Sequence, residues 1–198
     1  MAGRWTVAAG VLLALAAPAA AQMGFSDTYT LLKAVRERDV ATAQRILADP
    51  SSTALNARDQ QSGEGALHIV VRRRDLPWLN FLIARRPRID LESNDGMTAL
   101  ALASQIGWYD GVQRLLAAGA RVNAGNRRGE TPLMFAVQRI DVPLVRLLLQ
   151  QGADPNVTDN TAGLSAIDYA ARDPRAAQIL RMLREAPRQR AGQMGPTR

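Results

Sequence analysis

The feature that most constrains the fold of this chain is a repeat with a period of 33 residues. The segment GMTAL begins at Gly96 and the similar segment GETPL begins at Gly129, so corresponding residues are 33 positions apart. The same offset links further positions: Leu67 and Leu100; Leu82, Leu115 and Leu148; Gly119 and Gly152; Asp90, Asn123 and Asn156. Coincidence does not produce so many matched offsets. A fixed period of this length indicates stacked units of a solenoid or an array.

One unit of the repeat carries the start and stop signals of two short helices. Thr131 can cap a helix, and Pro132 fits its first position, where no hydrogen bond is lost. Pro143 gives a second start signal, and the run 144–149 supplies a wide apolar stripe. Gly152 can end the second helix in the left-handed conformation. Thr98 and Ser165 hold the capping position of their own units.

The stretch GETPLMFAVQRIDVPLVRLLLQQGADPNV resembles an ankyrin repeat over its full length. GMTALALASQIGWYDGVQRLLAAGARVNA is similar, with milder departures. Upstream, GEGALHIVVRRRDLPWLNFLIARRPRIDLE keeps the helix-two leucines but has Arg86-Pro87 where Gly-Ala is usual. AGLSAIDYAARDPRAAQILRMLRE resembles a terminal repeat, and TYTLLKAVRERDVATAQRILADPSSTALNA is the most divergent, with extra loop residues around 50–53. The resemblance covers about residues 26–186.

The resemblance implies an all-α repeat solenoid of about five units, the first and last being divergent caps. We expect repeats at about 26–57, 58–92, 93–124, 125–157 and 158–186, within a domain spanning 22–186. Stacking buries the apolar stripe of each unit, so the end units must turn a polar face to water. Thr42, Gln44 and Arg45 near one end, and Gln178, Arg181 and Arg184 near the other, fit that requirement. The polar segment 187–198 is expected to be disordered.

The first 21 residues have the layout of a secretory signal peptide. Arg4 precedes an uncharged apolar run over 7–17, then Pro18 and three alanines, which predicts cleavage before Gln22. The run is shorter than the ~20 residues of a spanning helix, and no stable membrane insertion is expected after cleavage. An uncleaved anchor or a buried N-terminal helix are the alternatives. The alanine-rich leader and arginine-rich chain favour a bacterial protein that is periplasmic or secreted.

Composition argues against catalysis. The chain has no cysteine and one histidine, His68, which excludes thiol catalysis and a Cys/His metal cluster. The resemblance implies that His68 bonds to neighbouring loop backbone, and Asp168, at the matching place in the last repeat, is expected to make a local cap or loop bond. No serine lies in a G-x-S-x-G elbow, and no glycine-rich phosphate loop is present. We therefore expect no enzyme activity, no cofactor and no metal.

The aromatic residues leave one question open. Trp78 lies on the apolar stripe of a second helix and is expected to pack in the core. Trp108 and Tyr109 follow Gly107 between two helices. They could form an exposed interface anchor or cover the adjacent repeat.

The resemblance implies that a partner binds the concave face, made by hairpin tips and by exposed residues late in each first helix. Carried over repeat by repeat, the expected partner-binding residues are Arg36, Arg72, Arg73, Asn94, Met97, Gln105, Arg127, Arg128, Glu130, Gln138 and Arg139. Arginine recurs among them, and the formal net charge is +7. A basic strip that grips acidic side chains is one interpretation. A solvated face is the other, and base composition alone could explain the arginine bias.

The leading hypothesis is a monomeric, non-catalytic module of the bacterial cell envelope that binds a protein partner, possibly an acidic one. The alternative is an accessory or inhibitor protein that stabilises or regulates one exported enzyme. Nucleic acid is not expected as a partner, since export and the absence of interleaved aromatic and basic residues argue against it.

Overall fold

The computed structural model describes residues 27–49 and 52–186. The expected leader, its cleavage point and the expected disordered tail lie outside these residues. The described elements are α1 (Asp27–Glu37), α2 (Val40–Leu47), η1 (Ala54–Asn56), α3 (Ala66–Arg72), α4 (Leu76–Ile83), α5 (Ala99–Gln105), α6 (Tyr109–Ala117), α7 (Pro132–Gln138), α8 (Val142–Gln150), α9 (Ala166–Arg172), η2 (Pro174–Ala176) and α10 (Ala177–Glu185).

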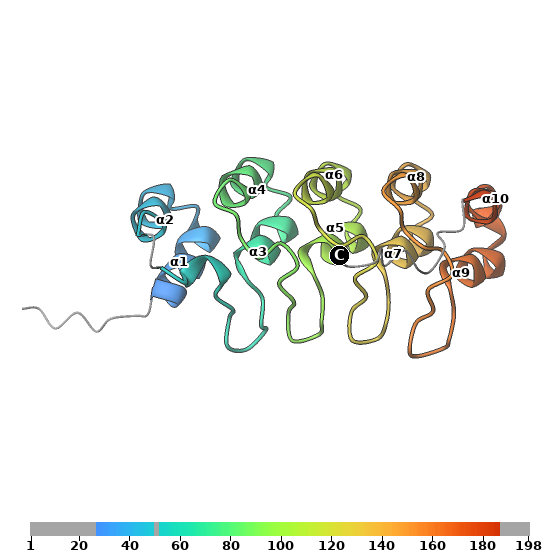
Figure 1. The fold of residues 1–198 in the computed structure, drawn as a ribbon, viewed down its shortest axis with the longest axis horizontal. Helices are drawn as coiled ribbons and strands as arrows, with labels where there is room; N and C mark the ends of the chain where they lie inside the picture. Colours follow the sequence, from blue (N-terminus) through green and yellow to red (C-terminus); the bar gives the residue numbers. More distant parts are fainter. Residues whose placement is uncertain (1–26, 50–51, 187–198) are drawn as a thin grey trace, which may run out of the picture.

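The helices form two parallel rows (Figure 1). The odd-numbered helices make an inner row, the even-numbered helices make an outer row, and the loops joining successive pairs extend below the inner row. The described residues contain no strand, and Thr158 and Ser165 form an isolated bridge. The predicted all-α repeat solenoid is confirmed. No helix in the described part of the chain is long and apolar enough to cross a membrane.

Three inner helices, α5, α7 and α9, begin at the predicted caps. The hydroxyl oxygens of Thr98, Thr131 and Ser165 accept the N–H three residues ahead, at 3.2, 3.3 and 3.2 Å. Satisfying such an N–H is worth about 1 kcal/mol per helix. Three outer helices have aspartate caps, which the sequence analysis did not name individually: Asp39, Asp75 and Asp141. In α8 the predicted start signal Pro143 lies just inside the helix, in its first turn, and Pro77 holds the same place in α4.

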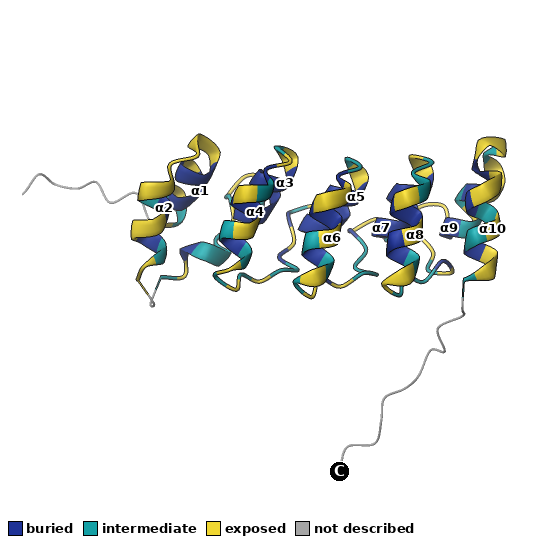
Figure 2. Cartoon of the chain, turned by 90° about the horizontal axis from the view of Figure 1, so that it is seen from above, coloured by how far each residue is buried: buried dark blue, intermediate teal, exposed yellow. Residues whose placement is uncertain are grey.

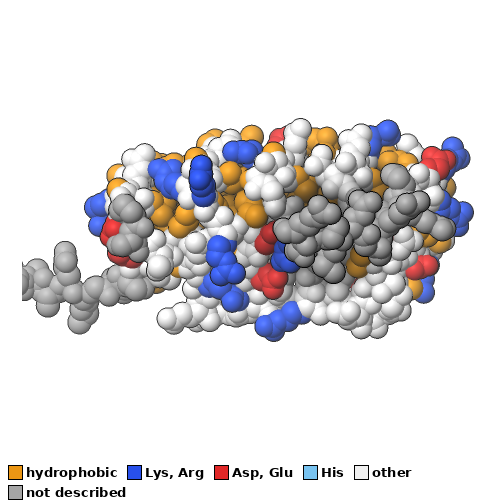
Figure 3. All heavy atoms as spheres, in the orientation of Figure 1, with side chains coloured by type: hydrophobic (Ala, Val, Ile, Leu, Met, Phe, Trp, Pro, Cys, Tyr) orange, Lys and Arg blue, Asp and Glu red, His pale blue; other side chains and the backbone are white. Residues whose placement is uncertain are grey.

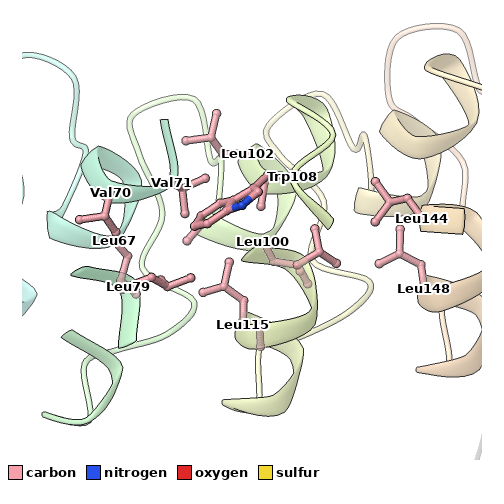
Figure 4. Close-up of a cluster of buried hydrophobic side chains, with 14 of the residues drawn as sticks. Leu67, Val70, Val71, Leu79, Leu100, Leu102, Trp108, Leu115, Leu144 and Leu148 are labelled. Carbon is pink, nitrogen blue, oxygen red and sulfur yellow. The ribbon is translucent and has the colours of Figure 1, made fainter. Parts of the chain in front are cut away.

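The core lies between the rows and between successive pairs (Figure 4). Leu82, Leu115 and Leu148 are completely buried, as their 33-residue spacing requires. Trp78 is 7% exposed, so its predicted place in the core is confirmed. Its ring meets Phe81 edge-on, with 5.1 Å between the centroids.

The two ends of the array keep polar outer surfaces. Gln44 and Arg45 on α2 are exposed, as are Gln178, Arg181 and Arg184 on α10. Figure 2 shows exposed residues along both terminal outer helices, with buried residues facing the neighbouring pair. Thr42 is half-buried, and the other residues named for the two polar end surfaces are exposed, as predicted.

The turn after α4 keeps its shape although it lacks glycine. Arg86 has φ +55°, and Gly119 and Gly152 at the same place have φ +88° and +85°. Because a side chain in the left-handed region costs about 1–2 kcal/mol, the repeat geometry prevails over the local preference of Arg86. Arg38, Arg74 and Ile140 take the same conformation between the two helices of their units, with φ of +52° to +61°.

Candidate functional site

A groove of about 590 Å³ runs across three successive hairpins and the late residues of α3 and α5. Six predicted partner-binding residues line it: Arg72, Asn94, Met97, Gln105, Arg127 and Arg128. Met97 supplies apolar surface, the buried Leu102 lies beneath it, and most of the remaining lining is polar. The other predicted residues, Arg36, Arg73, Glu130, Gln138 and Arg139, lie outside this lining.

Backbone hydrogen bonds tie each hairpin to the next. The N–H groups of Asn94, Arg127 and Asn160 donate to the carbonyls of Ser62, Asp95 and Arg128, at 2.9, 2.9 and 2.7 Å. These three bonds recur at the repeat period. They fix the spacing of the hairpin tips that border the groove.

One side chain at the start of each hairpin closes the loop from inside. Ser93 accepts from two N–H groups within its hairpin, and Asn126 does the same. The first and last hairpins use Asp59 and Asp159. The sequence analysis did not assign these positions, although a polar residue at the start of every hairpin was a usable signal.

Both carboxylates are strongly acidic. The N–H of Ser62, followed by the Arg36 guanidinium at 2.8 Å, lowers the pKa of Asp59 to about 2. The N–H of Ala162, followed by the hydroxyl of Tyr169 at 2.9 Å, lowers the pKa of Asp159 to about 2. Each bond favours the charged form, so ionisation of these groups stabilises the folded hairpins.

Replacing Asp159 by Asn is expected to lower the urea midpoint at pH 7. The amide keeps one acceptor oxygen but loses the second, which accepts from Leu164 and Tyr169. Because the folded pKa lies below the ordinary value, the wild-type advantage is complete above about pH 4 and disappears as pH falls through about 2. Urea titrations at pH 7, 4 and 2.5 check this. A difference between the two proteins that is as large at pH 2.5 as at pH 7 would refute the assigned role of the carboxylate.

Most of the predicted arginines already have partners within the array. Arg36 pairs with Asp59, Arg72 with Glu64, and Arg128 with Glu130. Figure 3 shows the mixture of basic and acidic side chains on one face of the molecule. Arg73 donates to the carbonyls of Val35 and Arg36, and Arg139 to the carbonyl of Gln105. These last two bind the end of the preceding inner helix, so they join repeats.

Arg127 differs from its counterparts in the neighbouring hairpins. The side-chain amide of Asn94 donates to Gln61 O at 2.8 Å, and that of Asn160 donates to Arg127 O at 3.3 Å. The Arg127 side chain is exposed and makes no hydrogen bond or ion pair within the described residues. It therefore contributes an unpaired guanidinium to the groove, next to a hairpin that also presents the exposed Asp95.

Comparison with protein families identifies the repeat. A model described as ankyrin repeats in three copies matches residues 31–126, and a second, described as ankyrin repeats in many copies, matches residues 115–170. The chain belongs to the ankyrin-repeat family. Together the two matches extend from α1 into α9.

Several proteins resemble part of this chain in sequence. An ankyrin repeat-containing protein of Treponema pallidum is 40% identical over 109 residues, which are 54% of this chain and 36% of that protein. The nuclear factor NF-kappa-B p105 subunit of Mus musculus is 38% identical over 106 residues, 50% of this chain and 11% of the relative. The B-cell lymphoma 3 protein homolog of Mus musculus is 33% identical over 130 residues, which are 63% of this chain and 28% of that protein. The chain thus spans about a third or less of the length of these relatives.

His68 links two ankyrin repeats, as the resemblance implied. Its Nδ1 accepts from Gly65 N–H at 3.2 Å, which places the proton on Nε2, and Nε2–H donates to Met97 O at 2.8 Å. The residue is completely buried, and burial lowers its pKa below the ordinary 6.5. Asp168, at the matching place in the last repeat, accepts from the N–H of Ser165 at 2.9 Å, and its predicted local bond is confirmed.

The buried imidazole makes the ankyrin array sensitive to mild acid. His68 is neutral when folded and binds a proton more readily when unfolded, so stability falls as pH drops below about 6.5. Between pH 7 and pH 5 the loss from this one group is expected to reach at most about 2 kcal/mol. Urea unfolding of the wild type and of His68→Gln at both pH values tests this. A wild-type loss no larger than that of the variant would contradict the neutral buried form.

The two adjacent aromatic residues whose role the sequence left open differ in burial. Trp108 is 7% exposed and lies among Val71, Leu100 and Leu102 (Figure 4). Tyr109 is 41% exposed, at the start of α6. Trp108 therefore covers the adjacent repeat, and Tyr109 alone is available at the surface. Within the described residues, no group of three or more His, Asp or Glu side chains is placed to hold a metal ion.

Proposed function

We propose that this protein is a non-catalytic interaction module of the bacterial cell envelope that binds a partner protein in the groove described above. The observation that carries the proposal is the groove itself, about 590 Å³ of mixed polar and apolar surface across three hairpins. Ankyrin repeats are generally protein-interaction modules, and membership of the family supports the same function.

The rigidity of the groove favours binding. The hairpin tips are fixed by the recurring backbone bonds, and the loops are closed from inside by Ser93 and Asn126. A surface ordered before binding loses little conformational entropy when a partner docks. Met97 offers apolar contact area, while Gln105 and Asn94 can donate and accept hydrogen bonds at the border of the groove.

Site-specific photocrosslinking in cells tests the proposed surface. A benzophenone amino acid at Gln105 faces the groove, and the same amino acid at the exposed Gln113 on outer helix α6 is the matched control. We expect one dominant crosslinked protein from the Gln105 position and none from Gln113. Equal crosslinking from both positions, or none from Gln105, would refute the groove as the binding surface.

The envelope location rests on the N-terminal sequence, with its apolar run over 7–17 and the alanines before Gln22. Cell fractionation followed by N-terminal sequencing tests it. The proposal requires a processed chain beginning at or near Gln22 in the periplasm or the medium. Full-length protein confined to the cytoplasm would overturn the location and leave the groove hypothesis standing.

A further inference from the structure

A second hollow lies away from the groove, between the ends of the outer helices α4 and α6. Its volume is about 320 Å³, and Ile83, Ile89, Ala117 and Ala118 provide apolar lining. Arg86 and Arg114 also line it. The lining lies wholly within the described part of the chain and contains no Asp or Glu. An apolar floor flanked by two cations is complementary to a group that is both apolar and anionic.

The repeat geometry sets the left-handed backbone of Arg86, but no contact of its side chain offsets the cost of that conformation. Three arginines take the left-handed conformation: Arg38, Arg74 and Arg86. Arg38 pairs with Asp75 at 2.9 Å, and Arg74 donates to the carbonyl of Ile106 at 2.5 Å, so both join adjacent repeats. The Arg86 side chain is exposed and makes no hydrogen bond or ion pair within the described residues.

The repeat itself shows that the turn does not need an arginine. Gly119 and Gly152 occupy the place of Arg86 in the next two repeats with the same sign of φ. Glycine adopts this conformation without steric cost, so arginine at this position strains the backbone and gains no visible contact. Strain that persists without a packing reason is typical of functional positions.

The second cation is held in place and keeps donors free. Arg114 donates through Nε to the side-chain oxygen of Asn80 at 2.5 Å, which leaves its terminal nitrogens available. In the loop that follows Arg86, the carboxylates of Asp90 and Glu92 both pair with Arg121. Those carboxylates are thereby neutralised by a cation outside the hollow.

We propose that this hollow binds a partner-protein segment that carries a carboxylate next to an aliphatic side chain. Arg86 and Arg114 hold the carboxylate, and the aliphatic side chain rests on Ile83, Ile89 and the two alanines. Guanidinium groups suit this function because they bind carboxylates through paired hydrogen bonds. The hollow and the groove across the hairpins have no lining residue in common, so either site can fail without the other.

Two dipeptides probe the site directly: N-acetyl-Asp-Leu-amide and its neutral counterpart N-acetyl-Asn-Leu-amide. They are titrated into the ¹⁵N-labelled full-length chain, and binding is followed at the backbone amides of Ala117 and Ala118. We expect saturable shifts with the aspartyl peptide and at least tenfold weaker binding of the asparaginyl peptide. No saturable shift, or equal affinity for the two peptides, would overturn the proposal.

Two variants separate binding from folding. Arg86→Gly introduces the residue that the next two repeats have at this position. We expect this variant to unfold at an unchanged or higher urea concentration and to bind the aspartyl peptide at least tenfold more weakly. Arg86→Gln keeps a long side chain at the same strained backbone position but removes the charge, and it should lose binding to the same extent. Arg146→Ala, on the exposed face of α8, is the matched control and should bind as the wild type does. Wild-type affinity in either Arg86 variant would refute the assignment.

Discussion

Replacing Leu148 by Ala is expected to lower the free energy of unfolding by about 2–5 kcal/mol. The side chain is completely buried between stacked repeats and repeats the place of Leu82 and Leu115. Its removal loses the transfer free energy of the deleted groups and leaves a cavity that rigid helices fill only in part. Urea unfolding followed by circular dichroism measures the change.

The neighbouring Leu149 provides a matched control for this variant. It lies on the same helix and is partly exposed, so Leu149→Ala removes the same atoms from a less buried place. We expect a clearly smaller loss than for Leu148→Ala. A loss below about 1 kcal/mol for Leu148→Ala, or equal losses for the two variants, would contradict the assigned core.

Replacing Gly96 by Ala is expected to destabilise the chain by about 2–4 kcal/mol. Gly96 has φ +72°, where a side chain costs about 1–2 kcal/mol. An added Cβ would also lie 2.7 Å from the backbone nitrogen of Arg127 in the next hairpin. Because backbone cannot move aside as a flexible side chain does, the junction between the hairpins must open.

Gly119→Ala separates the two causes. Gly119 has φ +88°, and an added Cβ there meets no atom within 4 Å. This variant should show the conformational cost alone, about 1–2 kcal/mol. Urea midpoints of both variants, measured side by side, test the contact between hairpins. Equal losses would mean that the close approach of Gly96 to Arg127 has no energetic weight.

The fold could be predicted because its determinants are local and repeated. Thr98, Thr131 and Ser165 cap helices through bonds that span three residues, and the buried leucines recur at one period. The aspartate caps of the outer helices were not located individually, because Pro143 was interpreted as the start of its helix, whereas Asp141, two residues earlier, is the cap.

The site could be predicted less fully, since its details depend on residues far apart in the chain. The resemblance to ankyrin repeats, carried over repeat by repeat, placed Arg72 and Gln105 on the expected binding face, and both line the groove. It could not show which acceptor a long side chain finds. Arg73 reaches carbonyls 37 and 38 residues upstream, and Arg139 reaches one 34 residues upstream. Burial of Trp108 likewise depends on Val71 in the preceding repeat.

The recurring hairpin bonds determine how the number of repeats in this protein can change. Each bond joins a residue to one in the adjacent unit, and the inner helices likewise contact the inner helix of the next pair. Excising or duplicating one whole period in the middle of the chain would give every remaining junction an equivalent partner. Gene duplication can therefore lengthen the row of hairpins in whole repeats, with no change to the two ends.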